Sequence, residues 1–218
     1  MTLEELIALY RAQSRDDTEP FFCSDELLAT YASEGQDEAC RRGQLLRDAA
    51  SPLCTIAYGA GDESVALDPR IVQVLLASVD GYPVDMVAVE QMDAIMPAWA
   101  SAPAAIRPNK LVTGLTTGRM HIWPTPSQPG QIKLRVLRMP LKKLVNDNDK
   151  PEIRPETHPA LVEWMLYRAY SRDDTDLHND GKAAIALAKF EAEFGRKASG
   201  RNEQWVRNGA ADGPSPIA

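Results

Sequence analysis

The chain has 218 residues, of which 44% are hydrophobic, so it can bury the core of one large domain or two small ones. Its 31 acidic residues outnumber its 24 basic ones, and the formal net charge of −7 argues against a protein whose main role is to grip nucleic-acid phosphates. It contains no apolar run of about 18 residues, so we expect no membrane span, and its acidic start, MTLEELIALY, lacks the basic region of a signal peptide.

Two helices are predicted in residues 1–50. Thr2 and Glu5 have the spacing of a capping box. The apolar stripe of the first helix comprises Leu3, Leu6, Ile7 and Tyr10. Ser24 is placed to cap the second helix, since two acidic residues follow it at the positive end of the helix dipole. Gly35 lies in the middle of this second helix, where glycine costs stability relative to alanine, so we expect close packing against a neighbour there.

From residue 51 the sequence becomes rich in Pro and Gly, and its pattern changes to that of strands. The clearest strand alternates Ile132, Leu134 and Val136 with charged residues. Six strands are predicted, over residues 53–58, 64–67, 71–79, 110–115, 119–123 and 131–137. A short helix is predicted over residues 89–96. Together these elements indicate a compact antiparallel β unit inserted between two helical pairs.

The helix predicted after residue 157 reads HPALVEWMLYRAY and is apolar on nearly all sides. Such a helix is normally buried on several sides, so we expect it at the centre of a bundle or between subunits. The residues expected to pack between subunits are Leu161, Trp164, Met165, Tyr167, Arg168 and Tyr170. A ten-residue acidic turn then leads to a second helix, which Asp180 is placed to cap at its start and Gly195 at its end.

The predicted fold class is therefore α+β. It comprises a helical bundle of four main helices, two at each end of the chain, an inserted antiparallel β unit of about six strands and a flexible C-terminal arm. The predicted domains are residues 1–50 with 157–195 for the bundle and residues 51–141 for the β domain. Residues 142–156 are predicted to be a linker, and residues 196–218 an extended C-terminal arm.

The stretch after Gly195 is rich in Gly, Ala, Ser, Asn and Pro and has no periodicity, which is typical of a segment without fixed structure in the free monomer. Trp205 and Val206 stand out in it. A large aromatic residue in such a tail buries much area when a partner arrives, so we expect it to dock on another chain. The alternative is that the tail folds back onto its own domain.

Two stretches of the chain are similar. Residues 9–19 read LYRAQSRDDTE and residues 166–176 read LYRAYSRDDTD, so nine of eleven positions match. Each stretch ends a predicted helix and leads through an acidic turn to another helix. The pair indicates either two related helical hairpins or two similar local ways to end a helix. In both cases Arg11 and Arg168 are equivalent and are expected to pair with nearby acidic residues.

No sequence motif indicates an enzyme. The acidic turn around Asp176, His178 and Asp180 resembles the start of a calcium loop, but Leu187 stands where a bidentate Glu is needed, so a solvated turn is the better interpretation. No zinc, nucleophile-elbow, P-loop or dinucleotide pattern occurs. The three cysteines are widely spaced, which favours buried thiols in a reducing compartment. We therefore expect no catalytic residue, no metal site and no cofactor.

A series of short segments runs through most of the first 195 residues. They are Ser24-Asp25-Glu26-Leu27-Leu28, Leu67-Asp68-Pro69-Arg70, Arg138-Met139-Pro140-Leu141, Pro151-Glu152-Ile153, the stretch 158–171, Lys182-Ala183-Ala184 and the stretch 190–195. In this order they resemble segments of tailed-bacteriophage head-to-tail adaptor, or connector, proteins. The sequence departs from that pattern at Arg154-Pro155, where the family more often has proline directly after the isoleucine.

The resemblance implies a virion structural protein of the neck, between the capsid portal and the tail. Such adaptors form a ring, usually a dodecamer, and genomic DNA passes through its channel without specific binding. The implied partners are the portal protein, a tail or nozzle protein and further copies of the chain, with no membrane. The C-terminal arm is implied to reach the portal. The residues expected to bind there are Arg196, Lys197, Arg201, Trp205, Val206 and Arg207.

Two alternatives to the adaptor remain open. One is another neck or tail-completion protein of the same virion. The other is a protein that binds a small ligand in its β unit. The adaptor role also leads us to expect acidic residues along the channel, because a negatively charged wall lets DNA slide instead of binding it.

Overall fold

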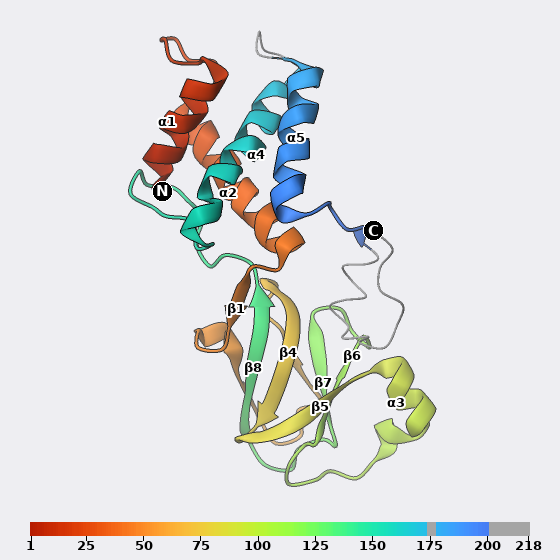
Figure 1. Cartoon of the computed structure of the whole chain (residues 1–218). Helices are drawn as coiled ribbons and strands as arrows, with labels where there is room; N and C mark the ends of the chain where they lie inside the picture. The colour runs from red at the N-terminus through yellow and green to blue at the C-terminus, as the bar shows by residue number, and fades with distance from the viewer. Residues whose placement is uncertain (174–177, 201–218) are drawn as a thin grey trace. The chain divides into compact units, whose positions relative to one another are not determined.

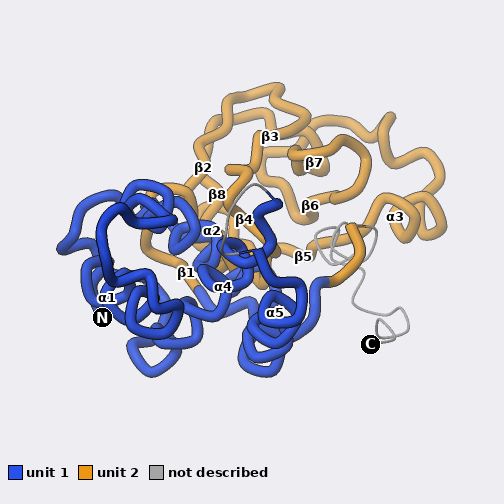
Figure 2. Tube along the Cα trace, turned by 90° about the horizontal axis from the view of Figure 1, so that it is seen from above, with its two compact units in different colours: residues 1–46, 139–197 blue, residues 47–138, 198–218 orange. Residues whose placement is uncertain are grey.

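The structure is a computed structural model, and it describes residues 1–173 and 178–200 (Figure 1). The chain forms two compact units, coloured separately in Figure 2. Among the described residues, the helical unit comprises 1–46 and 139–197, and the sheet unit comprises 47–138 and 198–200. In the described part of the chain, no helix is long and apolar enough to cross a membrane.

Four helices make up the helical unit, and α4 contacts the other three (Figure 1). Their bounds are α1, Leu3–Ser14; α2, Asp25–Gly43; α4, His158–Tyr170; and α5, Asp180–Phe194. Eight of the thirteen residues of α4 are buried, more than half of the helix. Burial of a large apolar side chain stabilises a fold by about 1.5–3 kcal/mol, so α4 is the main contributor to the core of this unit.

The helix ends follow from local hydrogen bonds. The predicted capping box is confirmed, since Glu5 N–H donates to Thr2 Oγ1 at 3.3 Å and Thr2 N–H donates to Glu5 Oε2 at 3.0 Å. Gly195 is confirmed as the residue that ends α5, with a φ of 87° that favours glycine. The predicted cap at Asp180 is wrong, because Asn179 Oδ1 accepts from the backbone N–H of Lys182 at 2.9 Å and Asp180 is already helical.

The sheet unit contains one curled, mixed sheet of eight strands. Their bounds are β1, Leu46–Asp48; β2, Thr55–Tyr58; β3, Ser64–Ala66; β4, Ile71–Val79; β5, Tyr82–Ala88; β6, Lys110–Thr113; β7, Arg119–Trp123; and β8, Gly130–Arg138. The order is β1-β8-β4-β5-β6-β7-β3, and β2 also pairs with β8. Helix α3, Val89–Ile95, follows β5. Single 3-10 turns lie at Pro52–Cys54, Trp99–Ser101 and Pro155–Thr157.

The predicted fold class, a four-helix bundle with an antiparallel insert of about six strands, is wrong. The described chain has five α-helices and eight strands, and β5 pairs with β6 in parallel. A parallel pair needs a long crossover, and residues 89–109 with α3 supply it. The prediction lacks β5 because Pro83 and Asp85 are residue types depleted in strands, and it lacks β1 because that strand has only three residues.

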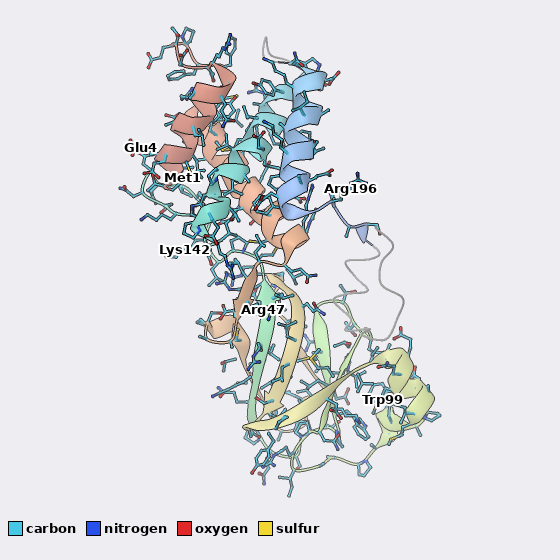
Figure 3. All side chains as sticks on the ribbon, viewed as in Figure 1. Met1, Glu4, Arg47, Trp99, Lys142 and Arg196 are labelled. Atoms are coloured by element: carbon cyan, nitrogen blue, oxygen red, sulfur yellow. The ribbon has the colours of Figure 1, made fainter. Side chains whose placement is uncertain are left out.

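Alternating side chains build the core of the sheet unit. Along β8, Ile132, Leu134 and Val136 are buried while the charged residues between them are exposed, as the sequence pattern predicts. A second cluster lies under α3, where Trp99 follows the helix (Figure 3). Trp123 Nε1 donates to the Trp99 carbonyl at 2.8 Å and so fixes the chain that leads from α3 to β6.

The two similar stretches end α1 and α4 in different surroundings. Asp16 is only 2% exposed, and its carboxylate accepts from the backbone N–H groups of Phe22 and Cys23 at 2.9 and 3.2 Å. The side chain of Asp173, the equivalent residue, is 97% exposed. Asp16 and Asp173 are therefore used differently, although both stretches end a helix.

The expected pairing of the two equivalent arginines is confirmed. Arg11 lies 2.6 Å from an Asp25 oxygen and 3.4 Å from an Asp16 oxygen, and Arg168 lies 2.9 Å from a Glu34 oxygen. Only the first of these sites contains a buried carboxylate that also accepts backbone N–H groups.

We expect Asp16→Ala to lower the free energy of unfolding by about 3 kcal/mol, because it leaves buried N–H groups without their acceptor and removes a partner of Arg11. The matched substitution Asp173→Ala should lower it by less than about 0.5 kcal/mol, because that carboxylate is exposed. Urea unfolding followed by circular dichroism measures both values. Equal losses for the two variants would contradict the difference in burial.

A largely buried ion pair joins β1 to the end of β8. Asp48 Oδ2 lies 2.6 Å from Arg138 Nε, and Asp48 Oδ1 accepts from the backbone N–H groups of Ala50 and Ser51 at 2.9 and 3.1 Å. Burial by itself raises the pKa of the Asp48 carboxyl, but the hydrogen bonds from Ser51, Ala50 and Arg138 lower it more, so this pKa is well below its ordinary value.

A carboxyl whose pKa is lowered by folding stabilises the protein above its unfolded pKa of about 3.9, and that contribution is lost as the pH falls below this value toward the folded pKa. We therefore expect Asp48→Asn to cost about 3 kcal/mol at pH 7 and progressively less below pH 4. The control is Asp85→Asn, which removes the exposed pair with Lys110 and should cost at most about 0.5 kcal/mol. Urea unfolding across this pH range measures the loss of unfolding free energy in Asp48→Asn. A loss that stays constant as the pH falls below 4 would refute the lowered pKa of Asp48.

Candidate interaction surfaces

The close packing predicted at Gly35 is confirmed, and it sets α4 against α2. A Cβ atom added at Gly35 would lie 3.2 Å from Trp164 Cβ, tighter than ordinary contact. The Trp164 ring in turn packs on Phe190 of α5 with ring centroids 5.0 Å apart. A single tryptophan of α4 therefore joins α2 and α5.

The residues expected to pack between subunits already pack within one chain. Leu161 and Met165 are fully buried, and Trp164 and Tyr170 are nearly so. Tyr167 is half-buried, as is Arg168, which pairs with Glu34. Intramolecular packing thus accounts for the apolar character of α4, and a role of these residues between subunits stays a prediction.

The segment from Met139 to the start of α4 is held on the helical unit by buried polar groups. Ser33 Oγ accepts from the Leu144 N–H at 2.9 Å and donates to its carbonyl at 3.2 Å. Gln36 Oε1, almost fully buried, accepts from the Glu152 N–H at 2.6 Å. His158 Nδ1 lies 2.9 Å from the amino nitrogen of Met1, which Figure 3 labels at the start of α1. These contacts fix the segment over α2 and at the start of α4.

A groove of about 600 Å³ lies between the end of α1 and α5, with α4 as its floor. We call it the basic groove; Arg15, Leu166, Tyr170, Lys182, Ile185 and Lys189 line it. Ile185 is 61% exposed although it stands among apolar floor residues. Lys189 pairs with Glu163 at 3.1 Å, and Lys182 lies 5.2 Å from the centre of the Tyr170 ring. The groove combines an unburied apolar centre with an excess of positive charge at its rim.

A second groove, of about 300 Å³, lies between α2 and the segment around Leu144. We call it the acidic groove; Glu26, Thr30, Ser33, Glu34, Asp37 and Val145 line it. Val145 is 70% exposed. Burial raises the pKa of the Asp37 carboxyl, and Lys143 partly opposes that rise. This groove also has an unburied apolar residue, but its excess charge is negative.

Neither groove is among the sequence-predicted sites, although the sequence carries a signal for the basic one. Lys182, Ile185 and Lys189 follow each other at spacings of three and four residues, so they share one face of a helix. An isoleucine between two lysines on an exposed face departs from the usual polar surface stripe. The acidic groove depends on Val145, which lies far from α2 in sequence, and only the fold brings it there.

The structure shows part of the predicted portal-binding set. Arg196 and Lys197 are exposed directly after Gly195, and Figure 3 labels Arg196 beyond the end of α5. The other four predicted residues lie outside the described part of the chain: Arg201, Trp205, Val206 and Arg207. Their role in binding stays a prediction.

Within residues 1–173 and 178–200, no three His, Cys, Asp or Glu side chains are grouped to hold a metal ion. His178 lies 3.8 Å from Asp173 and 3.7 Å from Asp180, and the turn between them includes residues outside the described ranges. A pocket between β4 and the turn after β6 has a volume of about 90 Å³, well below the ~300–1,000 Å³ of typical small-molecule sites.

Comparison with known proteins identifies the family. The family model described as SU10 adaptor protein matches residues 1–213, nearly the whole chain. No curated protein matches the sequence significantly. The match confirms the resemblance to head-to-tail adaptors that the sequence segments indicate. The chain belongs to the SU10 adaptor protein family of phage head-to-tail adaptors, and it is a structural protein of the phage particle.

Proposed function

We propose that this chain forms a ring in the virion neck that joins the portal to the tail and encloses part of the DNA channel. The observation that carries the proposal is the family match, because it spans both compact units and most of the C-terminal segment. The relation to adaptors therefore covers both units of the chain and is not limited to one of them.

The surfaces of the helical unit support a role in assembly. Two grooves of opposite charge each expose a large apolar residue, Ile185 in one and Val145 in the other. Exposed apolar residues with a polar rim are typical of protein interaction sites. The net charge of −7 suits a channel through which DNA slides.

The C-terminal segment is the proposed contact with the portal. It begins after Gly195 with two exposed basic residues, Arg196 and Lys197, and its later part contains Trp205. An aromatic anchor flanked by cations is the kind of segment that docks on another protein surface, since tryptophan and arginine carry much of the binding energy in interfaces.

The two alternatives receive less support. The pocket of the sheet unit near β4 is too small for a typical ligand, so it does not favour a small-molecule binding protein. A different neck or tail-completion protein is disfavoured by the family match itself.

The test is a pair of truncations mixed with purified portal rings from the same virion. A chain that ends at Gly195 should bind portal at least about tenfold more weakly, because it lacks the proposed arm. A chain that ends at residue 213, the limit of the family match, should bind like the full chain. Sedimentation with portal rings and negative-stain images measure attachment and ring formation.

Circular dichroism spectra should show that both truncated chains keep their helices, since α5 ends at Phe194. If the chain that ends at Gly195 binds portal rings as well as the full chain does, the C-terminal arm is not the portal contact. Full-length chains that attach to the portal singly, without forming a ring, would refute the ring.

A further inference from the structure

The two grooves of the helical unit lie on opposite sides of it. On α2, the groove residues Glu26, Thr30, Ser33 and Asp37 recur at spacings of three and four, so they form one stripe along the helix. Gly35, against which Trp164 packs, lies on the other side of α2. This stripe of the acidic groove therefore faces away from the Trp164 contact, while Glu34 at the edge of the groove reaches Arg168 of α4.

The basic groove is on the far side of α4. Its floor residues Glu163, Leu166 and Tyr170 share the face of α4 turned away from Trp164 and Arg168, the residues that contact α2. Figure 2, which views the helices from above, shows α4 between α1 and α5, with α2 off the line that joins these three. Both grooves belong to one compact unit, so their opposite placement does not depend on the sheet unit.

The charges of the two grooves are complementary. In the basic groove, Glu163 offsets Lys189, which leaves Arg15 and Lys182 as the excess cations. In the acidic groove, Arg168 offsets Glu34, which leaves Glu26 and Asp37 against the single cation Lys143. Opposite charges on two surfaces orient and select partners.

Each groove also presents an apolar residue that the chain does not cover. Ile185 is 61% exposed and Val145 is 70% exposed. Burial of such side chains is worth about 25 cal/mol per Å² of apolar surface. Contact between the two surfaces would remove both residues from water while the charges around them pair.

We propose that the acidic groove of one copy docks on the basic groove of the next copy. Such a contact joins two different faces of the same chain, so it is heterologous, and repetition with a closing rotation produces a ring. This contact rests on the proposed ring function and specifies which faces of the helical unit meet in it. The occupant of each groove is a second copy of this chain.

The first test exchanges charges on the full-length protein. Lys182→Glu or Asp37→Lys alone should weaken self-association at least about tenfold in low salt, because like charges then face each other. The two variants mixed in equal amounts should associate like the wild type, since every contact in an alternating assembly is again complementary. Sedimentation velocity measures the association, and Lys133→Glu on the exposed face of β8 is the matched control.

The second test cross-links the contact. A chain with both Val145→Cys and Ile185→Cys should give a ladder of covalent oligomers with a short bismaleimide, whereas a mixture of the two single variants should stop at dimers. The natural cysteines Cys23, Cys40 and Cys54 are buried and should not react. The control pair, Lys133→Cys with Ile185→Cys, should give no ladder.

The outcomes separate this contact from the proposed function. Any one of three results would overturn the contact, even if the full chain still forms rings on the portal. These are charge reversals that leave self-association unchanged, a mixture of the two variants that does not regain association, and a double-cysteine chain that gives no ladder. A ladder with charge-dependent rescue would support the contact even if the full chain failed to bind portal rings, a result that would refute the portal role instead.

Discussion

The helical unit depends on the burial of one helix that has almost no polar face. Helix α4 cannot lie on a surface without exposing large apolar side chains, so three other helices must pack around it. The absence of a side chain at Gly35 lets Trp164 approach α2, and the same ring reaches Phe190 of α5. A larger residue at this position would separate α2 from α4, because close-packed cores tolerate little added volume.

Buried polar groups then fix the segments that the apolar core does not specify. Asp16 holds the turn between α1 and α2 through two backbone N–H groups, and Ser33 and Gln36 hold the segment before α4. An unpaired buried polar group is costly, so each of these contacts selects one path for the chain. The consequence is a helical unit whose two outer grooves are bordered by fixed segments instead of loose loops.

The sequence predicts the parts of this structure that follow from local rules. The capping box of α1, the alternation along β8 and the tight approach at Gly35 all come from spacing and residue type. The parallel pairing of β5 with β6 could not be predicted in that way, because it depends on where a crossover of about twenty residues returns to the sheet. The acidic groove has the same origin, since Val145 meets α2 only through tertiary packing.

In an adaptor that assembles as proposed, the differences between its surfaces decide how its copies meet. A symmetric pair of identical faces would close at a dimer, whereas a ring needs two unlike faces that fit each other. The helical unit has this asymmetry, because the outer stripe of α2 carries carboxylates and the outer stripe of α5 carries lysines. The burial of α4 makes the asymmetry possible, since α2 and α5 both pack against it and leave their own outer stripes uncovered.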